Sequence, residues 1–285
     1  MFSTFFENVF LQMALWASLL ASLATGVIGS FVVVKRISFI AGSIAHSVLG
    51  GMGLCLWLQR SIGWQWADPL LGAFAAAILS ALSLGWVQLK YRQREDAVIA
   101  AIWSTGMAIG IIFVSLTPGA NVELLSYLFG NILWIEGKDL VHLALLDGLI
   151  LTVVFVYYKK FLSICFDEEQ AKLQGIATTR LYLLLLCLVA ISIVLLMQVV
   201  GTILVIAMLT IPATLAALLT NQLSKMMGIA AILCALFCLL GLWVAASLDW
   251  PPAATIALLS AISYLAFLLY TKNKKNPYQA IHLTK

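Results

Sequence analysis

Polar and charged residues occupy short stretches of this chain, and long apolar runs fill the sequence between them. A helix needs about 20 apolar residues to cross a bilayer, and runs near this length recur from end to end. The alternation over about ten residues that marks a membrane β-barrel strand is not seen. We therefore predict an all-α, polytopic membrane protein. The predicted spans are 9–34, 37–59, 70–89, 97–117, 140–158, 181–198, 200–219, 226–247 and 253–270.

The count of nine depends on two junctions. Eight spans result if the tight 34–37 hairpin or the 198–200 junction does not separate two helices. Segment 124–135 is apolar but too short to cross, which favours a re-entrant or interfacial helix. The longest polar connection, about 159–180, divides the spans into five and four. The absence of a Pro/Ser-rich linker predicts a single transmembrane domain over 1–285.

Composition supports a membrane protein. The chain has 285 residues, of which 63% are hydrophobic and 10% charged, whereas about a quarter of the residues of soluble domains are charged. The first apolar run has only Glu7 before it as a charge and exceeds a signal-peptide core, so it is predicted to be a retained span. The five cysteines form no CxxC pair, and the net charge of +4 requires no nucleic-acid partner.

The positions of the basic residues predict the orientation. They gather at alternate connections, which the positive-inside rule assigns to the cytoplasm, and the opposite connections are mixed or acidic. The N-terminus is then outside and the C-terminus cytoplasmic. The basic residues are Lys35, Arg36, Lys90, Arg92, Arg94, Lys159, Lys160, Lys172, Arg180, Lys225, Lys272, Lys274 and Lys275.

An energy source for transport is missing from the sequence. The Walker pattern GxxxxGK[ST] is absent, and the "GK" at Gly137-Lys138 lacks its other required residues. ATP-driven transport would therefore need a separate ATPase chain. The connection at 166–176, "FDEEQAKLQGI", predicts a short helix: Asp167, Glu168 and Glu169 suit its positive N-terminal end, and Gly175 suits its stop. This helix is either a docking element for a partner or a solvated loop helix.

Six segments in this order resemble one family, the membrane permeases of ABC transporters that import zinc, manganese or iron. They are "RISFIAGSIAHSVLGG" (36–51), "REDAVIAAIWSTGMAIGIIFVS" (94–115), "LLSYLFGNIL" (124–133), "FDEEQAKLQGI" (166–176), "VVGTILVIAMLTIPATLAALL" (199–219) and "ASLDWPPAATIALL" (246–259). The resemblance covers nearly the whole chain.

The resemblance implies a type II ABC importer permease fold in the bacterial inner membrane. It implies a non-catalytic subunit, with a second permease subunit (identical or related) around a central pathway, cytoplasmic ATP-binding subunits, and an extracytoplasmic metal-binding protein. It also implies that the helix around Asp167–Gly175 couples to the ATPase. No tightly bound cofactor is expected, only the transported ion and membrane lipid.

The resemblance assigns His46 to the translocation pathway, because many members carry Asp-x-x-x-His on this span. Gly42 stands at the Asp position here. The residues agree with a pathway position: ten residues beyond Arg36 is about 15 Å along a helix, near the middle of a core about 30 Å thick. Gly42, His46 and Gly50 share a face, where small residues admit another helix or leave open space. The alternative is that His46 bonds a carbonyl and holds two helices together.

Other residues are candidates for lesser roles. His142, Glu136, Asp139 and Asp249 could attract cations at the outer entrance, although exposed charges at span ends are mostly solvated. Pro212 leaves a carbonyl unpaired within a span, which predicts a kink, either lining the path or simply packed. Cys234, Cys238 and the eight methionines form no paired copper motif, and core packing is expected of them.

Two functions of other classes are weighed against an importer subunit. A secondary metal transporter driven by an ion gradient would use buried carboxylates and repeats. Asp147 is the one clearly intramembrane carboxylate, and no convincing repeat is seen. An intramembrane zinc protease would need an HExxH-type helix, which the sequence lacks. Imidazole and carboxylate ligands serve zinc, manganese and iron alike.

Overall fold

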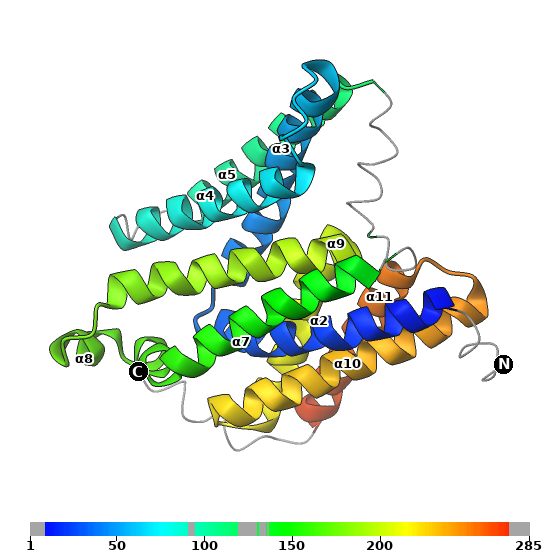
Figure 1. The fold of residues 1–285 in the computed structure, drawn as a ribbon. Coiled ribbons are helices and arrows are strands. Elements are labelled where there is room, and N and C mark those ends of the chain that lie inside the picture. The colour runs from blue at the N-terminus through cyan, green and yellow to red at the C-terminus, as the bar shows by residue number, and fades with distance from the viewer. Residues whose placement is uncertain (1–8, 91–94, 119–129, 131–134, 136, 274–285) are drawn as a thin grey trace.

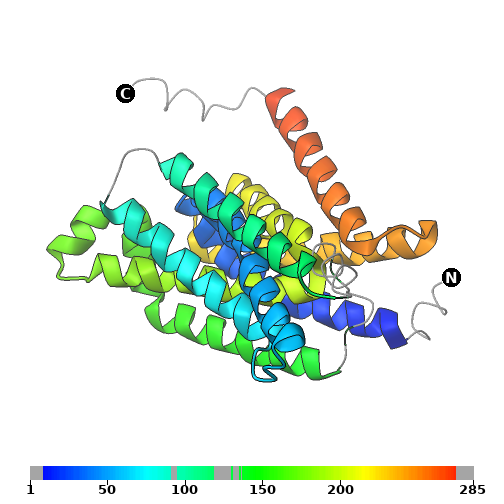
Figure 2. The same ribbon diagram turned by 90° about the horizontal axis from the view of Figure 1, so that it is seen from above.

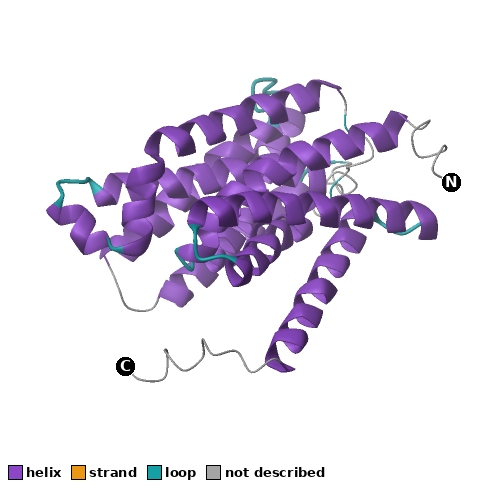
Figure 3. Ribbon diagram, turned by 90° about the horizontal axis from the view of Figure 1, so that it is seen from below, coloured by secondary structure: helices purple, strands orange, loops and turns teal. Residues whose placement is uncertain are grey.

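The computed structural model describes residues 9–90, 95–118, 130, 135 and 137–273, and these are helical almost throughout, with short connections (Figure 3). The helices are α2 (Val9–Val34), α3 (Ser38–Ser61), α4 (Pro69–Lys90), α5 (Glu95–Ser115), α7 (Gly137–Phe166), α8 (Glu168–Leu173), α9 (Thr178–Leu219), α10 (Leu223–Leu248) and α11 (Pro252–Asn273).

Within the described residues, nine helical segments are long and apolar enough to cross a membrane. Both doubtful junctions separate two spans. The chain leaves α2 through a Schellman turn, in which the amide of Ile37 donates to the carbonyl of Val32 and that of Arg36 to Val33, with Arg36 at φ 59°. The long α9 contains a break at Gly201, which has φ 78° and ψ 162°. The all-α prediction and the count of nine are confirmed.

The break in α9 occurs where only glycine fits. The backbone angles of Gly201 lie in a region that side-chain-bearing residues essentially do not adopt, and the two halves of α9 point in different directions on either side of it (Figures 1 and 2). Gly130 lies directly against the Val200–Gly201 peptide. The rest of the predicted re-entrant segment, 124–135, lies outside the described residues except for Ile135.

Helix α9 is the centre of the arrangement, in contact with α2, α3, α4, α7, α10 and α11. Figure 1 shows α3, α4 and α5 grouped on one side of it, and α2, α7 and α10 on the other. Small residues let the backbones approach: Gly26 of α2 lies against the backbone of Ala231 in α10. Larger rings fill the core elsewhere, as where Phe31 of α2 meets Phe161 of α7 edge to face at 5.5 Å.

Candidate metal pathway

His46 lies in the middle of α3, on the side of that helix that faces α5. Its ring stacks on the indole of Trp103, with ring centroids 4.4 Å apart and planes 8° apart. Trp103 is in turn oriented by its own helix, because its ring N–H donates to the sulfur of Met107 at 3.1 Å. No local pattern in the sequence predicts this pairing, because the two residues are far apart along the chain. Stacking fixes the plane of the imidazole and leaves its nitrogens unused.

The imidazole of His46 makes no hydrogen bond to the described residues. Its Nδ1 is buried and without a partner, although the residue as a whole is half-buried. The alternative role, a hydrogen bond to a neighbouring carbonyl, is therefore not seen. A buried ring nitrogen without a partner costs desolvation free energy. Such a group needs an explanation, and a ligand that visits the site transiently is one.

The glycines around His46 have opposite roles. A Cβ on Gly50 would lie 2.8 Å from the carbonyl oxygen of Gly106, and one on Gly53 would lie 2.7 Å from that of Gly110, so the C-terminal half of α3 is in backbone contact with α5. A Cβ on Gly42 would meet only the Cδ1 atom of Ile206, at an ordinary 3.7 Å. The two possibilities expected of these glycines thus divide between them: Gly50 admits another helix, and Gly42 leaves room for a side-chain carbon.

Hydroxyl groups also join α3 to its neighbours. Ser43 donates to the carbonyl of Ile99 in α5 at 3.0 Å, and the hydroxyls of Ser47 and Ser80 are hydrogen-bonded at 2.7 Å, linking α3 to α4. These serines flank His46 on the helix. Together with the glycine contacts, they hold α3, α4 and α5 as one unit around the imidazole.

Two predicted entrance residues line one cavity. Asp139 and His142, from the first turns of α7, face a space of about 240 Å³ whose lining also includes Asp68 and the methionines Met52 and Met197. The start of α7 lies at the end of the bundle opposite α8 (Figure 1). Asp68, which we did not single out, comes from the turn before α4. Within the described part of the chain, no three His, Cys, Asp or Glu side chains are placed to hold a metal ion together.

The other predicted entrance residues lie apart or cannot be placed. Asp249 ends α10 in the left-handed conformation, at φ 58°, and is not part of the lining of this cavity. Its position is explained by the turn into α11, because aspartate tolerates left-handed angles better than most residues. Glu136 lies outside the described residues.

The short helix predicted at 166–176 is present as α8. The carboxylate of Asp167 accepts the amide of Gln170 at 2.8 Å and caps the helix. Gly175, at φ 76°, ends it in a second Schellman turn. Glu168 pairs with Lys172 at 3.1 Å, and Glu169 is exposed. Because α7 continues to Phe166, the connection between α7 and α9 is shorter than the expected 159–180.

The interruption that we expected at Pro212 lies elsewhere. Gly201 is the residue of α9 with non-helical angles, whereas the helix continues through Pro212 to Leu219. Proline costs the helix one hydrogen bond, but its fixed φ is compatible with helical geometry. The left-handed angles at Gly201 end the helical path outright. Pro212 itself is buried.

Asp147 is a second unexplained polar group. It lies in α7 and is 3% exposed, and neither carboxylate oxygen has a hydrogen-bond partner. It shares a face of α7 with Asp139, two turns earlier, and with the buried Leu143 between them. Ionisable groups within spans are functional candidates by default.

Comparison with known proteins decides the family. Residues 7–271 match the ABC 3 transport family. The chain belongs to that family. A probable metal transport system membrane protein of Chlamydia pneumoniae is 45% identical over 261 residues, covering 92% of this chain and 88% of the relative.

Two other relatives of this chain are named for particular metals. A manganese transport system membrane protein of Listeria innocua is 33% identical over 264 residues, with 92% of this chain and 91% of that one covered. A probable iron transport system membrane protein of Haemophilus influenzae is 36% identical over 256 residues, with 87% and 88% covered.

The fold agrees with a solved structure of the same class. The chain superposes on PsaBC from Streptococcus pneumoniae, solved in complex with a Fab, with a TM-score of 0.82 and 29% identity over 93% of this chain and 95% of that chain. The protein is a multi-pass membrane permease of the ABC transporter class with the predicted fold.

Proposed function

We propose that this permease is the membrane subunit of an ATP-driven importer that carries zinc, manganese or iron across the bacterial inner membrane. The observation that supports this most is His46, a half-buried imidazole within a span whose buried Nδ1 has no partner. Imidazole is a good ligand for zinc, iron and related ions. Relatives named for manganese and iron transport support a cation of this class.

His46 would hold the ion weakly and briefly. It is the one His, Asp or Glu of α3, and Gly42 leaves room where a second ligand would stand. A site with four protein ligands would bind an ion too firmly to release it, so a single imidazole assisted by water or by the second subunit suits transport. Trp103 keeps the ring plane fixed while the ion passes.

The pathway would lie between two permease subunits, identical or related. His46 is only half-buried in the single chain. Its neighbour α5 presents large apolar side chains outward, with Ile109 40% and Ile112 56% exposed. A path for a cation would not face lipid directly. A second copy beside α5 would enclose it.

The remaining partners follow from the two ends of the bundle. The end with α8 would face the cytoplasm and meet the ATP-binding subunit through Asp167, Glu168, Glu169 and Gly175. The end with Asp68, Asp139 and His142 would face outward and receive the ion from a metal-binding protein, with the N-terminus on that side and the C-terminus inside. The permease itself would be non-catalytic, without a tightly bound cofactor.

Reconstitution tests this proposal. Proteoliposomes that contain the permease, its ATPase and its binding protein should take up Zn²⁺, Mn²⁺ or Fe²⁺ only when ATP is present. His46→Ala should lower uptake at least tenfold while the complex still assembles, whereas His142→Ala, at the entrance, should lower it less. Uptake that persists with a hydrolysis-dead ATPase would disprove ATP-driven transport, and wild-type uptake by His46→Ala would remove the pathway role.

A transporter driven by an ion gradient remains the second candidate, because Asp147 is buried without a partner. A carboxylate that gains and loses a proton within a span is the group such a mechanism needs. Membership of an ABC transport family favours the first candidate. A pH gradient imposed without ATP separates the two, since only the second candidate would then accumulate metal.

A further inference from the structure

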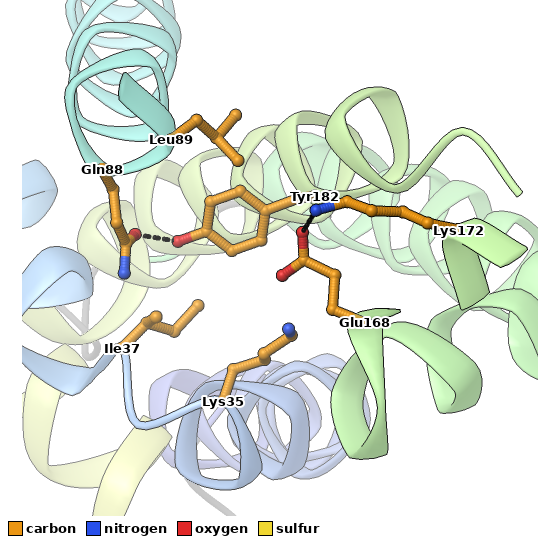
Figure 4. Close-up of a pocket in the computed structure, with 7 residues that line it drawn as sticks. All are labelled: Lys35, Ile37, Gln88, Leu89, Glu168, Lys172 and Tyr182. Atoms are coloured by element: carbon orange, nitrogen blue, oxygen red, sulfur yellow. Dashed lines mark hydrogen bonds and ion pairs between the residues drawn. The ribbon is translucent and has the colours of Figure 1, made fainter. Parts of the chain in front are cut away.

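A polar cavity lies where α2, α3, α4, α8 and α9 meet, at the end of the bundle that carries α8 (Figure 4). Its volume is about 360 Å³. The metal pathway at His46 and the outer cavity at Asp139 share no lining residue with it. The lining residues are Lys35, Ile37, Gln88, Leu89, Glu168, Lys172 and Tyr182.

Local turns bring two lysines to this cavity. Lys35 is the last residue before the left-handed Arg36 in the turn between α2 and α3, so the turn fixes the position of its backbone. Lys172 comes from the last turn of α8. Figure 4 shows both ammonium groups directed toward the same space, with the Tyr182 ring between α4 and α8. The tyrosine is 8% exposed, and its hydroxyl donates to the side-chain oxygen of Gln88.

The charges in the cavity do not balance. Glu168 is paired with Lys172 at 3.1 Å, and each neutralises the other. The ammonium of Lys35 lies over the ring of Tyr182, at 5.8 Å from its centroid, and no ion pair of Lys35 with a described carboxylate is found. The half-buried ammonium of Lys35 therefore faces an aromatic ring and no described carboxylate. The cavity therefore has one uncompensated positive charge.

The cavity lies at the level along the spans where lipid headgroups are expected. Lys35 and Leu89 stand at the ends of the spans α2 and α4. Leu89 is 37% exposed, and the ammonium of Lys90 lies 4.8 Å from the ring centroid of Trp86, an aromatic and basic pairing typical of the membrane interface. Basic pockets between spans at this level bind the headgroups of anionic lipids.

We propose that this cavity binds the phosphate of an anionic lipid headgroup, with the Lys35 ammonium as the main contact and Lys172 as a further donor. Free phosphate offers the same oxygens and is the other source of this ligand chemistry. A bound phosphate would connect the turn between α2 and α3 with α8. The proposal depends on the membrane location of the chain and not on which ion it carries.

Binding to the purified, delipidated permease in neutral detergent tests the proposal. Native mass spectrometry should show phosphatidylglycerol retained more strongly than phosphatidylcholine. Lys35→Gln should weaken the retention of phosphatidylglycerol about fivefold, and Lys35→Arg should preserve it. Lys225→Gln, an exposed lysine at the start of α10, is the matched control and should bind like the wild type.

Further measurements distinguish a lipid ligand from free phosphate and show when the proposal fails. If millimolar inorganic phosphate displaces phosphatidylglycerol, free phosphate is the ligand. If phosphatidylglycerol stays bound in the presence of phosphate, the lipid is the ligand. Either result supports the site. Equal retention of the two lipids, or an unchanged affinity in a folded Lys35→Gln variant, would overturn it. A labelling experiment with an amine reagent could also overturn it. If the ATPase protects Lys35 from the reagent and lipid does not, the cavity receives a protein partner.

Discussion

His46 of α3 lies parallel to Trp103 of α5, with the two rings 4.4 Å apart. Aromatic pairs of this kind contribute about 0.5–1.5 kcal/mol beyond their buried area. Trp103→Leu should therefore lower uptake severalfold by freeing the imidazole, and Trp103→Phe should preserve most of it. Uptake assays on vesicles, with assembly checked by co-purification of the ATPase, measure this. Equal uptake by the two variants would show that stacking does not matter for transport.

Gly42→Asp should convert a weak site into a stronger one. The added Cβ meets only Ile206 at 3.7 Å, and the carboxylate would stand one turn from His46. Carboxylate oxygens suit Mn²⁺, so isothermal titration of the purified variant with Mn²⁺ should show an affinity higher by about tenfold, which corresponds to ~1.4 kcal/mol. Gly50→Asp is the matched control: it should fail to fold, because its Cβ meets the backbone of Gly106. If the Gly42→Asp variant binds Mn²⁺ with unchanged affinity, position 42 does not lie beside the bound ion.

Gly175 should be replaceable only by residues that accept left-handed angles. Nothing lies within 4 Å of a Cβ built there, and φ is 76°, so strain and not crowding decides the outcome. Gly175→Asn should couple ATP hydrolysis to uptake nearly as well as the wild type. Gly175→Val, at a cost of roughly 1–2 kcal/mol, should reduce the ratio of ions moved to ATP hydrolysed. If both variants move the same number of ions per ATP hydrolysed, the end of α8 has no role in coupling.

Gly201→Ala should be among the most damaging glycine substitutions. Its angles exclude a side chain at a cost of about 1–3 kcal/mol, and Gly130 packs on the same peptide. A thermal unfolding scan should show a clearly lowered midpoint. Gly228→Ala, in the exposed part of α10 with open space around it, should leave the midpoint unchanged or raise it. A stable Gly201→Ala variant would mean that the break in α9 tolerates other angles.

Asp147→Asn should preserve ATP-dependent uptake. An ionised carboxylate without a partner in an apolar interior is costly, and the amide has nearly the same shape without the charge. The thermal midpoint should stay the same or rise. Loss of uptake by a folded, assembled variant would instead favour the mechanism driven by an ion gradient.

The spans could be predicted because their length and apolar character are local properties of the chain. The helix at Asp167–Gly175 could be predicted for the same reason, since a cap residue and a glycine stop act within a few positions. The break in α9 was close to a predicted junction, but proline was assigned the interruption that glycine produces. A missing hydrogen bond can be absorbed within a helix, whereas the angles of Gly201, φ 78° and ψ 162°, interrupt its path.

The residues of the candidate site could be predicted only in part. His46 stood out because an imidazole is rare within a span, and Asp139 and His142 because they are spaced as helical neighbours. Trp103 and Asp68 were missed, because they reach the site through contacts between distant segments. Gly42 and Gly50 are both glycines, each four positions from His46. The packing of α5 against Gly50, which a local pattern does not reveal, makes Gly50 crowded while Gly42 has room for a side-chain carbon.

The glycine contacts between α3 and α5 have a mechanical consequence. Two helices whose backbones touch at Gly50 and Gly106, and again at Gly53 and Gly110, cannot slide along each other without a clash. His46 and Trp103 would therefore travel as one rigid body during a transport cycle, and their mutual geometry would stay constant. Any change in how tightly an ion is held would then have to originate on the opposite wall of the path, where α9 and the second subunit can approach or withdraw.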